Sequence, residues 1–145
     1  MIKRRRSRES AIQVLYQRDR TKQDAQKALA HFKEHFLEKK ENDEFLVRIV
    51  LGVLDHEKEI DQLIEHYSEN WRLDRIAPID RAILRMAIFE LLYCEEIPPK
   101  VTLNEAVDLG KQYGSEDSGS FINGILDQIL NKVVRKPIQP TPIEH

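Results

Sequence analysis

Proline is absent from the long stretch between Arg8 and Ile76, and this absence limits what the chain can fold into more than any other feature of its sequence. Proline interrupts helices because it lacks a backbone N–H and clashes with the preceding turn, and only five glycines are spread over the 145 residues. Apolar residues recur about every three or four positions, which is the period of a helix with one buried face. The sequence therefore predicts an all-α protein of six or seven helices, with no strand.

The apolar pattern also places the individual helices. Their expected ranges are about 7–20, 24–39, 45–64, 78–93, 102–114 and 121–130. Gly52 and the charged residues after it interrupt the third range, which is therefore either one long helix or a kinked pair. Four boundaries carry capping signals: Ser7 as an N-cap, Thr102 with Glu105 as a capping box, Gly114 in the left-handed conformation, and residues 115–118 as caps of the last helix.

Chain length predicts one domain with two lobes. A chain of 145 residues, 41% of them hydrophobic and 33% charged, has the composition of an ordinary globular domain. We expect a single helical domain over residues 1–134, with an N-terminal lobe at about 7–70 and a C-terminal lobe at about 71–134. Residues 1–6 form a basic N-terminal segment, and residues 135–145, which include three prolines, form a loose tail.

The sequence offers little chemistry for an enzyme. The one cysteine, Cys94, stands beside two glutamates that raise a thiol pKa, and His31 and His35 have no further metal ligand nearby. Glycine-rich phosphate loops and HExxH patterns are missing. We therefore predict a protein that is not an enzyme and has no metal and no cofactor. The lone cysteine and the lack of an apolar leader predict a cytoplasmic location, and the most apolar stretch, 82–94, is too short to span a membrane.

The charge of the chain is concentrated at its N-terminus, although the net charge is only −2. Five basic residues precede the first acid: Lys3, Arg4, Arg5, Arg6 and Arg8. On an extended first helix Arg4 and Arg8 project together, with Arg5 and Lys3 nearby, and form a compact cationic edge. Arginine suits phosphate through its planar fork, so this edge is typical of RNA or DNA binding. A solvated basic leader remains an equal alternative on charge alone.

Aromatic rings suited to stacking on unpaired bases come from four positions: Tyr16, Tyr67, Tyr113 and Phe121. Each ring belongs more often to the hydrophobic core than to a platform for bases.

Five blocks of sequence, in order along nearly the whole chain, match a known pattern. They are residues 4–9 with Ala11 and 15–17, then 71–76, 79–85, 98–111, and 116–118 with 121–127. In these blocks the chain resembles the NusB family of bacterial transcription antitermination factors. The resemblance implies two roughly perpendicular three-helix bundles that bind boxA-type single-stranded RNA together with NusE, a ribosomal protein of the small subunit. It also implies a role in processive transcription of ribosomal RNA operons, within a wider antitermination complex with RNA polymerase.

The resemblance further implies which residues carry these contacts. The RNA-binding residues carried over are Lys3, Arg4, Arg5, Arg8, Tyr16, Tyr67, Asp117, Ser118 and Phe121. The acid at position 117 would weaken RNA binding by repulsion. Asp80 matches a position on the family's NusE surface and is the expected partner contact. The charged stretch 34–44 and the tail depart from the family pattern and inherit no role.

Two other functions and two oligomeric states stay open. A similar helical domain forms the N-terminal RNA-binding part of certain ribosomal RNA cytosine methyltransferases, although a chain that ends at His145 without a strand-rich cofactor domain is not expected to methylate RNA. A helical protein-interaction scaffold is the other alternative. The protein is either a monomer or a homodimer, and a dimer that covered the arginine edge would be autoinhibitory. We expect no membrane association.

Overall fold

The structure is a computed structural model, and the part of the chain that it describes comprises residues 2–21, 27–28, 30–31, 34, 44–69 and 72–134. Four expectations fall wholly or partly outside these residues: the helix over 24–39, the stretch 34–44, the side chain of Lys3 and the tail 135–145.

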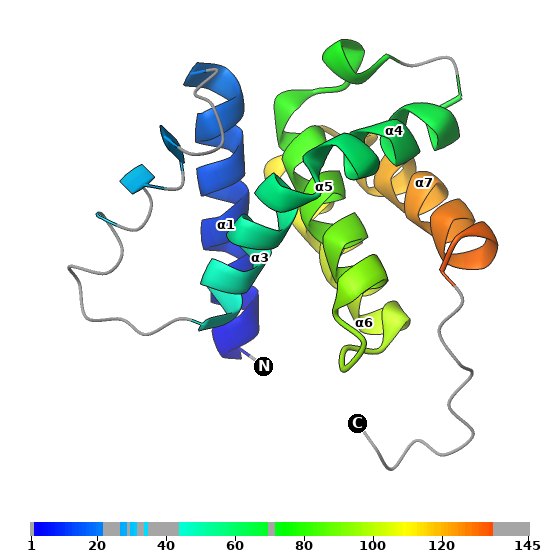
Figure 1. Cartoon of the computed structure of the whole chain (residues 1–145). Helices are drawn as coiled ribbons and strands as arrows, with labels where there is room; N and C mark the ends of the chain where they lie inside the picture. The colour runs from blue at the N-terminus through cyan, green and yellow to red at the C-terminus, as the bar shows by residue number, and fades with distance from the viewer. Residues whose placement is uncertain are drawn as a thin grey trace.

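The described residues form six α-helices and one short 3-10 turn, with no strand among them (Figure 1). The helices are α1 (Ile2–Thr21), α3 (Glu44–Asp55), α4 (Glu57–Tyr67), α5 (Pro78–Tyr93), α6 (Pro99–Tyr113) and α7 (Ser118–Lys132), and the 3-10 turn is Leu73–Arg75. The prediction of an all-α protein with six or seven helices is confirmed. The segment 45–64 is the kinked pair, and the break lies at His56.

Helix α5 lies at the centre of the fold and contacts each of the other five α-helices (Figure 1). Every residue from Ala82 to Leu91 is buried, including Arg85 and Glu90. A single apolar cluster includes side chains from all six helices. Helix α5 therefore serves as the core of the whole described molecule, because a helix that is apolar on most of its circumference must be covered on every side.

Gly52 keeps its helical conformation and does not break the chain, contrary to the expected interruption. Helix α3 runs through Gly52 to Asp55, and the ring of Phe89 on α5 packs against it. A Cβ atom at position 52 would lie 2.1 Å from two atoms of that ring. The glycine therefore allows α3 and α5 to approach closely.

Two of the expected helix boundaries are wrong in their detail. Helix α6 begins at Pro99, so Thr102 lies inside the helix, where its hydroxyl donates to Glu90 instead of capping. Glu105 accepts hydrogen bonds from Arg5, so no capping box forms. Gly114 ends α6 as predicted, but in an extended conformation (φ −95°, ψ −158°) and not a left-handed one. Tertiary packing has therefore taken over Thr102 and Glu105, the two residues that the local pattern marks as a capping box.

A buried ion pair joins α1, α5 and α6. Arg8 donates from Nε and Nη2 to the two carboxylate oxygens of Glu90, over 2.8 and 2.7 Å, and Thr102 Oγ1 donates to Glu90 Oε1 over 3.0 Å. The side chains of Arg8 and Glu90 are 2% and 0% exposed. Burial alone would lower the pKa of Arg8, but the hydrogen bonds and the charge of Glu90 outweigh it and raise that pKa. The pair is a bidentate contact that fixes the position of α1 on the core.

Glu90→Gln should destabilise the fold strongly. The substitution preserves side-chain shape but leaves the buried charge of Arg8 without its main counter-charge, so the free energy of unfolding should fall by about 3–5 kcal/mol. Urea denaturation measures this difference. The matched control is Glu96→Gln, which breaks a pair with Arg48 at the surface and should cost less than about 1 kcal/mol. Equal, small effects for the two variants would show that the buried pair does not stabilise the fold.

Candidate nucleic-acid interface

The basic N-terminal residues belong to α1, which is helical from Ile2 onward. Ser7 therefore lies inside the helix and is buried, and its prediction as an N-cap is wrong. Because the helix includes the arginines, each one points in a direction set by its position on the helical turn. Their surroundings differ accordingly.

Arg8 does not belong to an exposed cationic edge, contrary to the prediction. Its side chain is buried against Glu90, and Glu105 Oε1 lies 3.4 Å from Nη1. The sequence carries no local sign of this arrangement, because Glu90 is 82 residues away. A guanidinium at this depth cannot meet RNA without leaving the core.

Arg5 is half-buried and pairs with two acids of α6. Its Nε donates to Glu105 Oε1 over 3.1 Å, and Nη2 lies 3.4 Å from Asp108 Oδ2. The hydrogen bond to Glu105 is the main reason why the pKa of Arg5 is raised. Part of the charge of Arg5 is thus balanced within the protein.

Arg4 is exposed, and its guanidinium carbon lies 4.8 Å from the centre of the Phe45 ring on α3. This distance is within the range of cation–π attraction. The guanidinium carbon of Arg8 lies 5.2 Å from the same ring centre. Arg4 and Arg8 therefore do share one side of α1, as predicted, but only Arg4 reaches the surface.

Tyr113, at the end of α6, is an exposed ring that hydrogen-bonds to α1. Tyr113 is 45% exposed, and its hydroxyl donates to Glu9 Oε2 over 2.6 Å. This hydrogen bond is the main cause of the raised pKa of Tyr113. The sequence offers Tyr113 as one of four candidate rings and does not place it among the RNA-binding residues. Only its exposure in the fold separates it from a core ring.

The turn between α6 and α7 is tightly built and presents one acid to solvent. Ser118 is buried, and its Oγ accepts a hydrogen bond from the backbone N–H of Ser115 over 2.9 Å. A Cβ atom at Gly114 would lie 2.3 Å from that Oγ, so glycine is required there. Asp117 is exposed at the start of α7 and makes no side-chain capping bond, while Phe121 is half-buried.

Tyr16 and Tyr67 are both half-buried and lie on different helices. Arg20 donates from Nη1 to the hydroxyl of Tyr16 over 3.2 Å. Tyr67 ends α4, where its ring meets His66 edge-on with the ring centres 4.6 Å apart. Within the described ranges, no hydrogen bond or ring contact joins either tyrosine to Arg4 or Arg5. The described contacts therefore do not join these tyrosines to the arginines at the start of α1.

Asp80, the predicted partner contact, is only 7% exposed. Its Oδ1 is buried and has no hydrogen-bond partner among the described residues. Burial raises the pKa of Asp80, and a hydrogen bond from Ser118 opposes that rise. Asp80 thus connects the first turn of α5 to the turn before α7.

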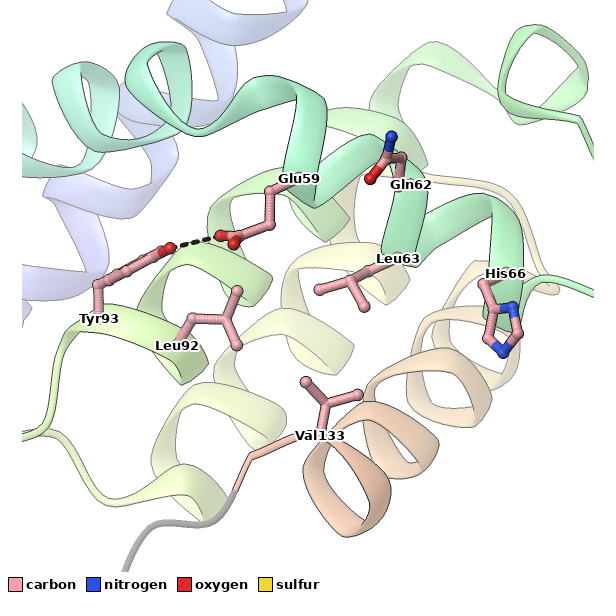
Figure 2. Close-up of a pocket in the computed structure, with 7 residues that line it drawn as sticks. All are labelled: Glu59, Gln62, Leu63, His66, Leu92, Tyr93 and Val133. Carbon is pink, nitrogen blue, oxygen red and sulfur yellow. Dashed lines mark hydrogen bonds between the residues drawn. The ribbon is translucent and has the colours of Figure 1, made fainter.

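A groove of about 500 Å³ lies between α4 and the C-terminal ends of α5 and α7 (Figure 2). Its lining residues are Glu59, Gln62, Leu63, His66, Leu92, Tyr93 and Val133. Figure 2 shows the hydroxyl of Tyr93 pointing at Glu59, to which it donates a hydrogen bond. No local pattern in the sequence marks this groove, because it depends on how α4 lies against the C-terminal ends of α5 and α7.

The described part of the chain contains no group of three or more histidine, cysteine, aspartate or glutamate side chains that could hold a metal ion. None of its helices is long and apolar enough to cross a membrane.

Comparison with known proteins places the chain in a family. The model of the NusB family matches residues 5–131. The transcription antitermination protein NusB of Syntrophus aciditrophicus (strain SB) is 47% identical over 136 residues, which cover 94% of this chain and 84% of that protein. The protein of the same name from Bacillus subtilis (strain 168) is 41% identical over 132 residues, covering 91% of this chain and 98% of the relative.

Solved structures agree with the sequence comparison. NusB of T. maritima superposes with a TM-score of 0.82 at 37% identity, covering 92% of this chain and 94% of that one. A crystal structure of the antitermination factors NusB and NusE in complex with dsRNA matches with a TM-score of 0.76 at 30% identity, covering 90% and 98% of the two chains. The chain therefore belongs to the NusB family, a family of transcription antitermination factors and not of enzymes.

Proposed function

We propose that this protein binds boxA-type single-stranded RNA together with NusE and supports processive transcription of ribosomal RNA operons, in a complex that includes RNA polymerase. The observation that carries the proposal is the face formed by the start of α1, the exposed Tyr113 ring and the turn before α7. The start of α1 carries the exposed arginines Arg4 and Arg6, and Glu9 on the same helix holds the exposed Tyr113 ring. Arginines and aromatic rings are the groups that hold a single strand. A relative of 30% identity solved with NusE and RNA supports the choice of partners.

The proposed RNA-binding residues contribute unequally. Arg4 offers an exposed guanidinium, whereas Arg5 shares its charge with Glu105, and Arg8 acts by holding α1 in place. Asp117 adds an exposed negative charge in the turn before α7. With few uncompensated cations, the protein alone should bind RNA weakly, and a second protein on the same RNA adds its own free energy of binding.

Asp80 is the proposed contact for NusE. Its buried Oδ1 accepts no hydrogen bond from a described residue, which costs free energy. A donor from a basic partner would supply the missing hydrogen bond and recover that cost. Because that oxygen is covered in the free protein, the contact requires the side chain to turn toward the partner. Lys3, Tyr16, Tyr67, Ser118 and Phe121 complete the proposed site, with Ser118 acting by shaping the turn.

RNA titrations with and without NusE test the function. A boxA oligonucleotide should bind at least about tenfold more tightly when NusE is present, because the second contact becomes intramolecular. A scrambled oligonucleotide of the same length is the control and should gain much less. Equal affinity for boxA with and without NusE would refute cooperative binding.

Asp117→Asn should strengthen RNA binding. The substitution removes an exposed negative charge at the turn without removing a capping bond, so affinity should rise about two- to fivefold. Fluorescence anisotropy at several salt concentrations measures the change, which should shrink as salt rises. Asp127→Asn, an exposed acid further along α7, is the matched control and should have little effect. Unchanged binding by Asp117→Asn would place the RNA away from the turn, and weaker binding would contradict the repulsion.

A further inference from the structure

The arginines of α1 that were carried over from the family are already engaged within the protein. Arg8 is buried with Glu90, Arg5 pairs with Glu105, and Arg4 lies over the Phe45 ring. Arg6 and Arg20 are both exposed, and neither makes an ion pair with any residue that the structure describes. Arg6 and Arg20 are therefore exposed arginines available to phosphate, as Arg4 also is, and neither is among the RNA-binding residues that the family resemblance implies.

A single face of α1 contains both of these arginines together with Tyr16. We call it the α1 stripe, and its members are Arg6, Glu9, Gln13, Tyr16 and Arg20. Their spacing alternates between three and four residues, so the five side chains follow one line along the helix. All five are exposed or half-buried. At about 1.5 Å per residue the stripe is about 21 Å long.

Arg20 is held against Tyr16 at one end of the stripe. Its guanidinium carbon lies 5.8 Å from the centre of the Tyr16 ring, and Nη1 donates to the hydroxyl over 3.2 Å. The neighbouring acid, Asp19, is occupied by Arg81 and Arg85 on α5 and does not neutralise Arg20. A guanidinium held through one N–H keeps its other in-plane donors free for a phosphate.

Glu9 is the one acid of the stripe, and its carboxylate accepts the hydrogen bond from Tyr113. This bond keeps the exposed Tyr113 ring beside the stripe, between the positions of Arg6 and Tyr16. The stripe thus offers two cations at its ends and aromatic groups between them, an arrangement that suits a strand with phosphates outside and bases against rings.

We infer that the α1 stripe is the path of the RNA strand, with Arg6 and Arg20 binding phosphates at its two ends and Tyr16 and Tyr113 meeting bases between them. The inference rests on the proposed function, since it names the route of the same RNA. It assigns the phosphate contacts to side chains that form no ion pair with any described residue, and it leaves Arg8 and Arg5 to hold α1 in position.

Arg6→Gln and Arg20→Gln test the two ends. Two probes are titrated, a boxA oligonucleotide with NusE and a single-stranded oligouridine with the protein alone. Each variant should bind both probes about two- to fivefold more weakly. Each should also lower the slope of log affinity against log salt by about 0.7. The control is Lys132→Gln, which makes the same charge change at the end of α7 and should leave both affinities unchanged.

Two further variants separate the charge of Arg20 from its geometry. Arg20→Lys keeps the charge, so the salt slope should return to its original value while the affinity recovers only in part. Tyr16→Phe keeps the ring but removes the hydroxyl that holds Arg20, so its effect and that of Arg20→Gln should combine to less than their product. Thermal melts confirm that these surface variants stay folded.

The outcomes distinguish this inference from the proposed function. If Arg6→Gln and Arg20→Gln bind both probes as the unchanged protein does, or if Lys132→Gln loses as much, the stripe is not the RNA path. If NusE adds no affinity for boxA but Arg20→Gln still weakens oligouridine binding, the proposed function fails and the stripe stands. If the unchanged protein binds neither probe, both are overturned.

Discussion

A carboxylate and a guanidinium face each other at the meeting point of α1, α5 and α6, and the placement of the N-terminal helix depends on them. Glu90 is fully buried on the central helix, and the three hydrogen bonds from Arg8 and Thr102 help to offset its loss of water. Removing water from such a pair costs free energy that largely cancels the attraction between the charges. Compared with an apolar contact, the pair therefore contributes less to stability than to the orientation of the two helices. The two hydrogen bonds from the planar guanidinium of Arg8 to Glu90 set the orientation of α1 on the core.

A second group of charges holds the other end of α1. Asp19 lies 2.7 Å from Arg81 and 3.1 Å from Arg85, and Arg85 also binds Asp61 on α4 over 2.8 Å. Between the two ends, Ala11, Ile12 and Leu15 are buried in the core. Helix α1 is therefore fixed by ion pairs near both ends and by apolar packing in the middle, while its outer stripe stays open to solvent.

The sequence could predict the number and the approximate ranges of the helices, because apolar periodicity and proline positions are local signals. It could not predict the roles of Ser7, Thr102 and Arg8. Each has a local interpretation, as a cap or as a surface cation, that is correct chemistry in isolation. Each is instead buried, Thr102 and Arg8 against the same Glu90. Likewise, nothing local separates Arg6 from Arg4, since their difference arises from the direction of the core. Family resemblance alone implies Asp117 as a site residue, and in the structure it is exposed.

The contrast between buried and exposed arginines means that ionic strength acts on two properties of the molecule separately. Mobile ions cannot enter the space between Arg8 and Glu90, so salt hardly weakens the contact that holds α1. The same ions compete directly for the outer stripe, where Arg6 and Arg20 meet solvent. A rise in salt therefore releases a bound strand from a helix that keeps its place, and the empty face is ready to bind again without refolding.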